Sequence, residues 1–305
     1  MSAEVTWGLV STIKAPAEAV LNFCAHHLDL GAHRLFIYLD DDNMEAFRIL
    51  SDHPKVRPVL CDAAYWQKRG MKRRAKHQSR QFENAKQAYN RAKDIDWLTH
   101  IDVDEFLWPD RPIAALLAEL PPECLSARMR PWEALAPDPA VQTAQTCFKG
   151  FSVAQPQRRH QTEQIYPEFG SHLNGGFLSH VAGKMFYRTG IKGLKVQIHN
   201  VFVHEEMNPG QVELAAVKLL HLHAKSWDDF YRAFHFRLEK GSYRSELRPN
   251  KPREEGGKSL HELLAEIYAK GGEDGLHQFY QAVCQASPDL LARLDRQGHL
   301  LRADL

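Results

Sequence analysis

The sequence lacks the features of disulfide-rich, membrane-spanning and strongly charged proteins. Its five cysteines are an odd number, lie far apart and include no C-x-x-C pair, which argues against a disulfide scaffold and a zinc site. No segment approaches the roughly 20 apolar residues that a bilayer-spanning helix needs, and the first residues do not resemble a signal peptide. Lys and Arg number 39 against 38 Asp and Glu, so no overall charge attracts nucleic acid. These absences predict a soluble cytoplasmic protein with no transmembrane segment and no nucleic-acid partner.

What is present is the composition of a globular protein. Of the 305 residues, 44% are hydrophobic, which is enough for a sizeable core and excludes a disordered chain. In the first half, short apolar runs at residues 5–13, 35–39, 56–60 and 97–101 predict strands, and helical patterns separate them. This order predicts an α/β protein with a mainly parallel sheet and helices on both faces.

The second half of the sequence is less regular. Residues 131–156 contain several prolines and no clean period, and we expect a long, partly structured connection there. Strands are predicted at 184–188 and 219–223, and Ser226 is placed to cap the helix that follows. A polar linker is predicted at 249–258, and two short helices end the chain.

The sharpest local pattern is the acidic segment Asp102-Val103-Asp104-Glu105, which follows the fourth predicted strand. Side chains two apart on an extended backbone point the same way, so Asp102 and Asp104 are expected to face one site while Glu105 turns away. Two close carboxylates repel unless a cation lies near them, and Mg²⁺ and Mn²⁺ prefer such oxygen ligands. An acidic turn or a helix cap explains the same triplet without a metal.

Further polar residues lie where the same site is expected. Ligands of such sheets bind beyond the carboxyl ends of the strands, and the second predicted strand also ends in acids, including Asp40 and Asp42. His221 and His223, two apart at a strand end, can face one way and complete a metal site. Lys225 can hold a phosphate as a point charge. The alternative is a pair of half-buried histidines bonded to backbone.

A basic stretch between Lys68 and Arg80 precedes the fourth strand. It fits a solvated helix face, a nucleic-acid patch or a mobile loop that gathers phosphates, and the near-neutral net charge disfavours nucleic acid. Arg80 and Asn84, four residues apart, share a helix face and are expected to point toward the ligand.

Together these segments resemble GT-A type nucleotide-sugar glycosyltransferases, and within them the bacterial family 2-like group that carries a D-x-D-E-F segment. The resemblance runs from the first strand to about Lys240. Its segments are VSTIKAP, FCAHHLDLGAHRLFIYLDDDN, HQSRQFENAKQAYNRAKDIDWLTHIDVDEFLWP and HLHAKSWDDF. The chain departs from the group at Ala15-Pro16, where Asn-Glu is usual after the lysine.

The resemblance implies a GT-A-like single large domain over residues 1–240, with a nucleotide-sugar-binding half at 1–120 and an acceptor half at 121–240. A helical C-terminal extension would occupy 241–305. It implies transfer of a sugar from a nucleotide-diphosphate donor, a UDP-sugar above all, to a hydroxyl of a glycan or glycolipid, with inversion. Mn²⁺ or Mg²⁺ would neutralise the departing diphosphate. A lipid-linked acceptor would bring the enzyme to the inner membrane surface.

The candidate residues follow from the patterns and the resemblance together. The predicted metal ligands are Asp102, Asp104, His221 and His223. The predicted donor-binding residues are Thr12, Lys14, Asp40, Asp42, Arg80, Asp102, Lys184 and Lys225. For the base that deprotonates the acceptor the first candidate is Glu133, followed by Glu168 and Glu205, with a structural role as the alternative for each. Asp104 is also counted as catalytic.

Two other functions fit the same residues. A nucleotidyltransferase or phosphotransferase would place its metal on the same Asp pair. A non-catalytic module would keep the sheet and bind a nucleotide sugar or a glycan.

Overall fold

The computed structural model describes residues 4–240 and 249–305. The chain divides into two compact units, each made of two stretches of sequence. The first extends to Arg130 and adds Ala182–Leu219; the second comprises Pro131–Val181 and Leu220–Leu305. This division cuts the chain at points other than the predicted domain boundaries at 120 and 240, which remain a prediction. Residues 241–248 of the predicted C-terminal extension lie outside the described residues.

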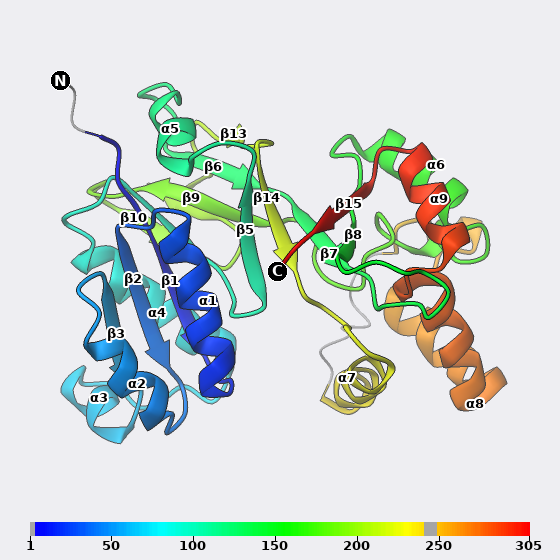
Figure 1. Ribbon diagram of the computed structural model, residues 1–305, viewed down its shortest axis with the longest axis horizontal. Coiled ribbons are helices and arrows are strands. Elements are labelled where there is room, and N and C mark those ends of the chain that lie inside the picture. The colour runs from blue at the N-terminus through cyan, green and yellow to red at the C-terminus, as the bar shows by residue number, and fades with distance from the viewer. Residues whose placement is uncertain (1–3, 241–248) are drawn as a thin grey trace. The chain divides into compact units, whose positions relative to one another are not determined.

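A seven-stranded sheet in the order β13-β6-β9-β4-β1-β2-β3 forms the first unit (Figure 1). Its strands are β1 (Trp7–Ile13), β2 (Arg34–Leu39), β3 (Val56–Leu60), β4 (Trp97–His100), β6 (Ser126–Met129), β9 (Lys184–Arg188) and β13 (Val212–Glu213). All neighbouring pairs are parallel except those of β9, which runs antiparallel to β4 and to β6. The predicted α/β class and the mainly parallel sheet are therefore confirmed.

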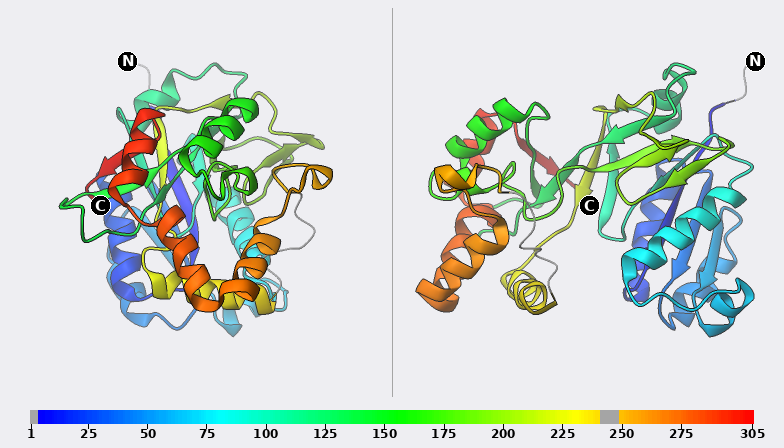
Figure 2. Two further views of the ribbon diagram at one scale, coloured as in Figure 1. Left: turned by 90° about the vertical axis from the view of Figure 1, so that its right-hand side faces the viewer. Right: turned by 180° about the vertical axis from the view of Figure 1, so that it is seen from behind.

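Helices cover both faces of this sheet because successive side chains along a strand point to opposite sides. Leu9 of β1 belongs to the core cluster shared with α1 (Ala17–Asp29) and α2 (Met44–Ser51). The next residue, Val10, belongs to the cluster shared with α4 (His77–Arg91). Figure 1 shows α1 in front of the sheet, and the view from behind in Figure 2 shows α4 over its other face.

The other elements of the first unit are short. They are β5 (Glu105–Pro109), α3 (Ala63–Lys68), α5 (Ile113–Ala118), β10 (Leu194–Val196), β11 (Val201–Val203) and β12 (Glu206–Met207). Strands β10, β11 and β12 form an antiparallel sheet that the sequence did not predict, because two or three residues show no period. Residues 197–200 join β10 to β11 in a tight turn, in which the Gln197 N–H donates to the Asn200 carbonyl at 2.8 Å.

The second unit combines helices with a small antiparallel arrangement of strands. Its helices are α6 (Gln155–Ile165), η1 (Gly170–His172), α7 (Trp227–Lys240), η2 (Arg253–Glu255), α8 (Leu260–Cys284) and α9 (Pro288–Arg296). Strand β8 (Thr146–Lys149) pairs with β7 (Pro131–Ala134) and with β15 (Leu300–Ala303). β14 (Val217–His221) begins in the first unit and ends in the second.

Several predictions for this half can be compared with the structure. The predicted cap of α7 is confirmed, because Ser226 Oγ accepts the Asp229 N–H at 3.1 Å. The range 131–156, expected to be a long, partly structured connection, contains the strands β7 and β8. These strands have four residues each and are buried at three of the four positions, so they show no alternation. No helix in the described part of the chain is long and apolar enough to cross a bilayer.

Candidate functional site

Three parallel strands of the first unit end in polar side chains at one edge of the sheet. Thr12 lies near the end of β1, Asp40 follows β2 directly, and Asp102 lies two residues beyond β4. All three strands run in the same direction, so their carboxyl ends lie at the same edge. This is the edge at which open α/β sheets bind ligands.

One helix, α4, bonds to all three of these side chains. Asn84 Nδ2 donates to Thr12 Oγ1 at 3.1 Å, and Arg80 Nε donates to the Asp40 carboxylate at 2.8 and 2.9 Å. Gln81 Nε2 donates to Asp102 Oδ1. The helix thus fixes the polar groups at the ends of β1, β2 and β4 together.

The sequence of α4 explains why it can do this. Residues three or four apart on a helix lie on one side, so Asn84 shares a face with both Gln81 and Arg80. Ala85 and Ala88 are buried in the same core cluster as Val10 of β1, and their small side chains let the helix lie close to the strands. The predicted common face of Arg80 and Asn84 is present, and both side chains are buried.

Asp40 is the centre of a buried ionic network. Its side chain is fully buried and accepts bonds from Arg80, from Arg73 at 2.9 Å and from His77 at 3.1 Å. Burial alone would raise the pKa of Asp40, but the hydrogen bonds from His77 and Arg80 and the charges of Arg80 and Arg73 hold it well below the usual value. Asp40 is therefore a carboxylate at neutral pH.

Arg80 is held inside the protein. Its Nη1 donates to the Arg74 and Ala75 carbonyls at 2.8 Å, its other donors bond to Asp40, and its side chain is 8% exposed. Arg80 was expected to point toward a ligand. In the structure its guanidinium instead binds and positions the Asp40 carboxylate. Arg73, which is 47% exposed, is the partner of Asp40 that reaches solvent.

Two further predicted donor-binding residues lie at the surface of the same unit. Lys14 directly follows β1, Asp42 lies two residues after Asp40, and both side chains are exposed.

The segment after Lys14 is held by Asn43. This residue caps α2 through its side chain, which also donates to the Ala15 carbonyl at 2.9 Å. This bond fixes the segment after Lys14, where the sequence departs from the pattern it resembles.

The D-x-D segment differs from its predicted geometry. Residues 103 and 104 form a turn instead of extended backbone. Because the chain turns, the Glu105 carboxylate does not face away from Asp102 as predicted: it accepts the Asp102 N–H at 2.8 Å. Period-two alternation fails wherever the strand ends before the motif, and here β4 ends at His100.

Lys184 of β9 lies between these two acids. Its Nζ donates to Asp102 Oδ2 at 2.7 Å and lies 3.3 Å from Glu105 Oε2, while the side chain is 1% exposed. Burial lowers the pKa of Lys184, but Asp102 and Glu105 outweigh this effect and raise the pKa above its usual value. The site therefore contains a fixed ammonium group beside Asp102.

The described residues include no group of three or more His, Cys, Asp and Glu side chains that could hold a metal ion. Both oxygens of Asp102 bond to nitrogen donors, Gln81 and Lys184, which disfavours Asp102 as a metal ligand. Asp104 is half-buried, and its carboxylate is of the kind that hard cations prefer.

The remaining predicted ligands belong to the second unit. His221 ends β14, and its ring centroid lies 5.2 Å from that of His223. Lys225 is exposed. Their participation in one site with Asp104 stays a prediction.

The first candidate for the base is in a structural setting. Glu133 of β7 is 1% exposed, and its carboxylate accepts the Leu178 N–H at 3.0 and 3.2 Å, so it anchors the segment around residue 178. Glu168 and Glu205 are exposed, and Glu205 lies in the turn between β11 and β12 with a φ of 73°.

Sequence reasoning missed Gln81 and His77 as members of the site, and it placed Arg73 only within the basic stretch between Lys68 and Arg80. The signal available for Gln81 was its place beside Arg80 on α4. The partnership of Lys184 with Asp102 joins residues 82 positions apart, and no local pattern indicates it.

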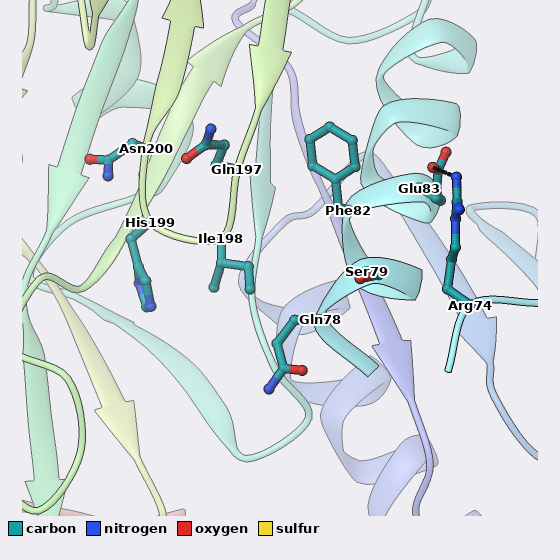
Figure 3. A pocket seen from close by; sticks show the side chains of 9 residues that line it. All are labelled: Arg74, Gln78, Ser79, Phe82, Glu83, Gln197, Ile198, His199 and Asn200. Atoms are coloured by element: carbon teal, nitrogen blue, oxygen red, sulfur yellow. Dashed lines mark ion pairs between the residues drawn. The ribbon is translucent and has the colours of Figure 1, made fainter. Parts of the chain in front are cut away.

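Two cavities of the first unit flank this network. One of about 480 Å³ lies along α3 and is lined by Trp66, Gln67, Lys72 and Arg73, among others. A second, of about 520 Å³, lies between α4 and the turn at 197–200 (Figure 3). Arg73 connects the first cavity with Asp40, since it bonds to Asp40 and lines the cavity.

Comparison with known proteins assigns no family. No family model matches the chain, and no curated protein matches it. Among solved structures, the chain is similar to HddC from Yersinia pseudotuberculosis, with a TM-score of 0.38 and 10% identity over 75% of this chain and 98% of that one. It is also similar to GalNAc-T7 with UDP, GalNAc and Mn²⁺, with a TM-score of 0.38 and 9% identity over 88% of this chain and 58% of that one. Likenesses this weak decide neither family nor function.

Proposed function

We propose that the protein is a glycosyltransferase that takes a sugar from a nucleotide-diphosphate donor, a UDP-sugar above all, and transfers it to a hydroxyl of a glycan or glycolipid. The observation that carries the proposal is the network by which α4 bonds to Thr12, Asp40 and Asp102 at one edge of a parallel sheet. The sequence resemblance to GT-A enzymes points to the same edge.

The chain's own cations suit the departing diphosphate. When the bond between the anomeric carbon and the diphosphate oxygen breaks, negative charge builds on the diphosphate, and fixed positive groups lower that barrier. Arg73 is held by Asp40 and lines the cavity along α3 together with Lys72. We assign these two residues to the diphosphate, and Asp40 and Arg80 to positioning Arg73.

The proposal includes Mn²⁺ or Mg²⁺. Asp104 would be among the ligands of the ion, which when bound would neutralise diphosphate charge. No step is assigned to it, because Asp102 is already bonded to nitrogen donors. The acceptor hydroxyl loses its proton to a base, for which Glu133 is disfavoured by its bond to the Leu178 N–H.

The decisive experiment measures which phosphate product is released. The protein is incubated with UDP-, GDP- and dTDP-sugars and a panel of glycan acceptors, with Mn²⁺, with Mg²⁺ or with EDTA. Nucleoside diphosphate release is expected to fall about 10²-fold or more in Arg73→Ala, because Arg73 is assigned to the departing diphosphate. Lys192→Ala, at an exposed lysine of the same unit, is the control.

Other products would contradict the proposal. Release of pyrophosphate or inorganic phosphate would identify a nucleotidyltransferase or a phosphotransferase. Binding of every donor without turnover across the acceptor panel would identify a non-catalytic module. Equal rates in EDTA and in Mn²⁺ would remove the metal from the proposal and leave the transferase in place.

A further inference from the structure

The cavity between α4 and the turn at 197–200 has no role in the function proposed above. Its volume is about 520 Å³, which is within the range of small-molecule sites. Figure 3 shows Phe82 and Gln78 projecting from α4 on one side and Gln197 and Ile198 on the other. These α4 residues lie on the opposite face of the helix from Arg80, so the cavity is distinct from the Asp40 network.

The lining of this cavity combines an apolar aromatic ring with uncharged groups that form hydrogen bonds, and its one arginine and one glutamate pair with each other. Phe82 is 37% exposed, which leaves part of a large aromatic ring open to a ligand. The side-chain amides of Gln78 and Gln197 lie on opposite walls and offer both donors and acceptors. Arg74 and Glu83, which also line the cavity, pair with one another at 3.7 Å, and Glu83 lies 3.7 Å from Arg69 as well.

Both walls of the cavity contain residues that are linked through the backbone to the partners of Asp102. Phe82 follows Gln81, which donates to Asp102. On the other wall, His199 Nδ1 lies 2.9 Å from the Gly183 carbonyl, and the next residue is Lys184, the second partner of Asp102. The residues that line the cavity are therefore next in sequence, or bonded through one backbone group, to residues that hold this carboxylate.

The wall at 197–200 is held in place by Arg128, which is 5% exposed. Its guanidinium donates to the His199 carbonyl at 3.0 Å and to Asn200 Oδ1 at 2.9 Å. Because these bonds fix the turn before a ligand arrives, binding does not have to order it.

We propose that this cavity binds a neutral sugar ring of the acceptor, with one face of the ring packed on Phe82 and its hydroxyls bonded to Gln78 and Gln197. A sugar ring combines an apolar face with a rim of hydroxyls, which matches this lining. A nucleoside diphosphate matches it less well, because the arginine here is paired with Glu83, whereas Lys72 and Arg73 line the cavity along α3. The inference rests on the proposed transferase function and specifies its acceptor site.

The test is direct binding, which requires no turnover. Ligand-observed NMR is recorded with glucose, galactose, N-acetylglucosamine and their β-1,4-linked dimers, and separately with UDP. At least one sugar is expected to bind the wild-type protein, and Phe82→Ala is expected to weaken that binding roughly fivefold to tenfold. Phe82→Tyr keeps the ring and should retain binding. Ile49→Ala removes another exposed apolar side chain of the same unit and should leave binding unchanged.

Three outcomes would overturn the inference: no sugar of the panel binds the wild-type protein, sugars bind Phe82→Ala as well as wild type, or Phe82→Ala loses UDP instead of the sugar. The last outcome would make the cavity a nucleoside site. Sugar binding that depends on Phe82, without release of nucleoside diphosphate from any donor, would keep the cavity assignment and reject the transferase.

Discussion

At the scale of single residues, the site depends on two buried ionic groups, one of each sign. Lys184 is enclosed with Asp102 and Glu105, and Asp40 is enclosed with Arg80. Removing one member of a buried pair costs far more than the pair contributes, because the partner keeps its charge without compensation. Both groups therefore give sharp predictions.

Lys184→Met should strongly destabilise the protein. The substitution keeps most of the side-chain volume but leaves Asp102 and Glu105 side by side without their ammonium partner. We expect a loss of about 3–5 kcal/mol in the free energy of unfolding, measured by urea denaturation. Lys192→Met, an exposed lysine, is the control and should change it by less than about 0.5 kcal/mol. Equal stability of the two variants would show that Lys184 is not held as described.

Asp40→Asn should destabilise the protein in a pH-dependent way. The pKa of Asp40 is lowered in the folded state, so its carboxylate stabilises the protein above the ordinary value of 3.8, and this contribution is lost as the pH falls below that value. We expect a loss of roughly 3 kcal/mol at pH 7 and a smaller loss at pH 3, measured by urea denaturation at both. Asp42→Asn, an exposed acid, should differ little from wild type at either pH. A loss that is the same at pH 7 and pH 3 would contradict this assignment.

At the scale of elements, the approach of β6 to the segment before β9 positions Lys184. Gly183 has a φ of 70°, and a Cβ atom there would lie 1.9 Å from the Met129 carbonyl oxygen. Backbone atoms cannot move aside as a flexible side chain can, so only glycine fits at this position.

Gly183→Ala should therefore destabilise the protein more than Gly190→Ala. Gly190 has a similar φ of 74° and open space around it. Alanine at 190 should therefore lower the free energy of unfolding only through backbone strain, by about 1 kcal/mol or slightly more. Alanine at 183 adds the clash with β6 and moves Lys184. We expect Gly183→Ala to lose at least about 2 kcal/mol more than Gly190→Ala in chemical denaturation. Similar losses for the two variants would mean that β6 shifts to accommodate the added methyl group at residue 183.

The helices and strands differ in how well the sequence predicts them and their contacts. β1, β2 and β4 were predictable because their apolar runs are continuous, and Arg80 and Asn84 were predictable because helical spacing is local. The bond between Lys184 and Asp102 was not, since it depends on β9 inserting antiparallel between β4 and β6. The turn at Asp102 was missed because alternation says nothing about where a strand stops.

At the scale of the whole molecule, buried histidines set the response to acid. Burial lowers the pKa of His27 to about 3, with a smaller effect from the neighbouring His26, and burial lowers the pKa of His100 to about 3. Neither ring nitrogen of His100 has a hydrogen-bond partner among the described residues. Unfolding allows both imidazoles to take up a proton below their ordinary pKa of 6.5, so acid favours the unfolded chain.

The stability of the protein should therefore fall between pH 7 and pH 5, well above the range in which Asp40 titrates. Each histidine is expected to contribute about 2 kcal/mol to this fall, because each pH unit below 6.5 corresponds to about 1.4 kcal/mol. In His100→Phe, which removes one titrating ring without removing a hydrogen bond, the difference in unfolding free energy between pH 7 and pH 5 should shrink by about 2 kcal/mol. An unchanged difference in His100→Phe would show that His100 takes up protons in the folded state.

The attachment of α4 to three strand ends has a consequence for how the protein responds to its ligands. A helix is stiff over a few turns, so a displacement that pulls Arg80 away from Asp40 also shifts Gln81 and Asn84. The ends of β1, β2 and β4 are therefore mechanically coupled through α4. Binding of a ligand at any one of these strand ends should slow amide hydrogen exchange along the full length of α4.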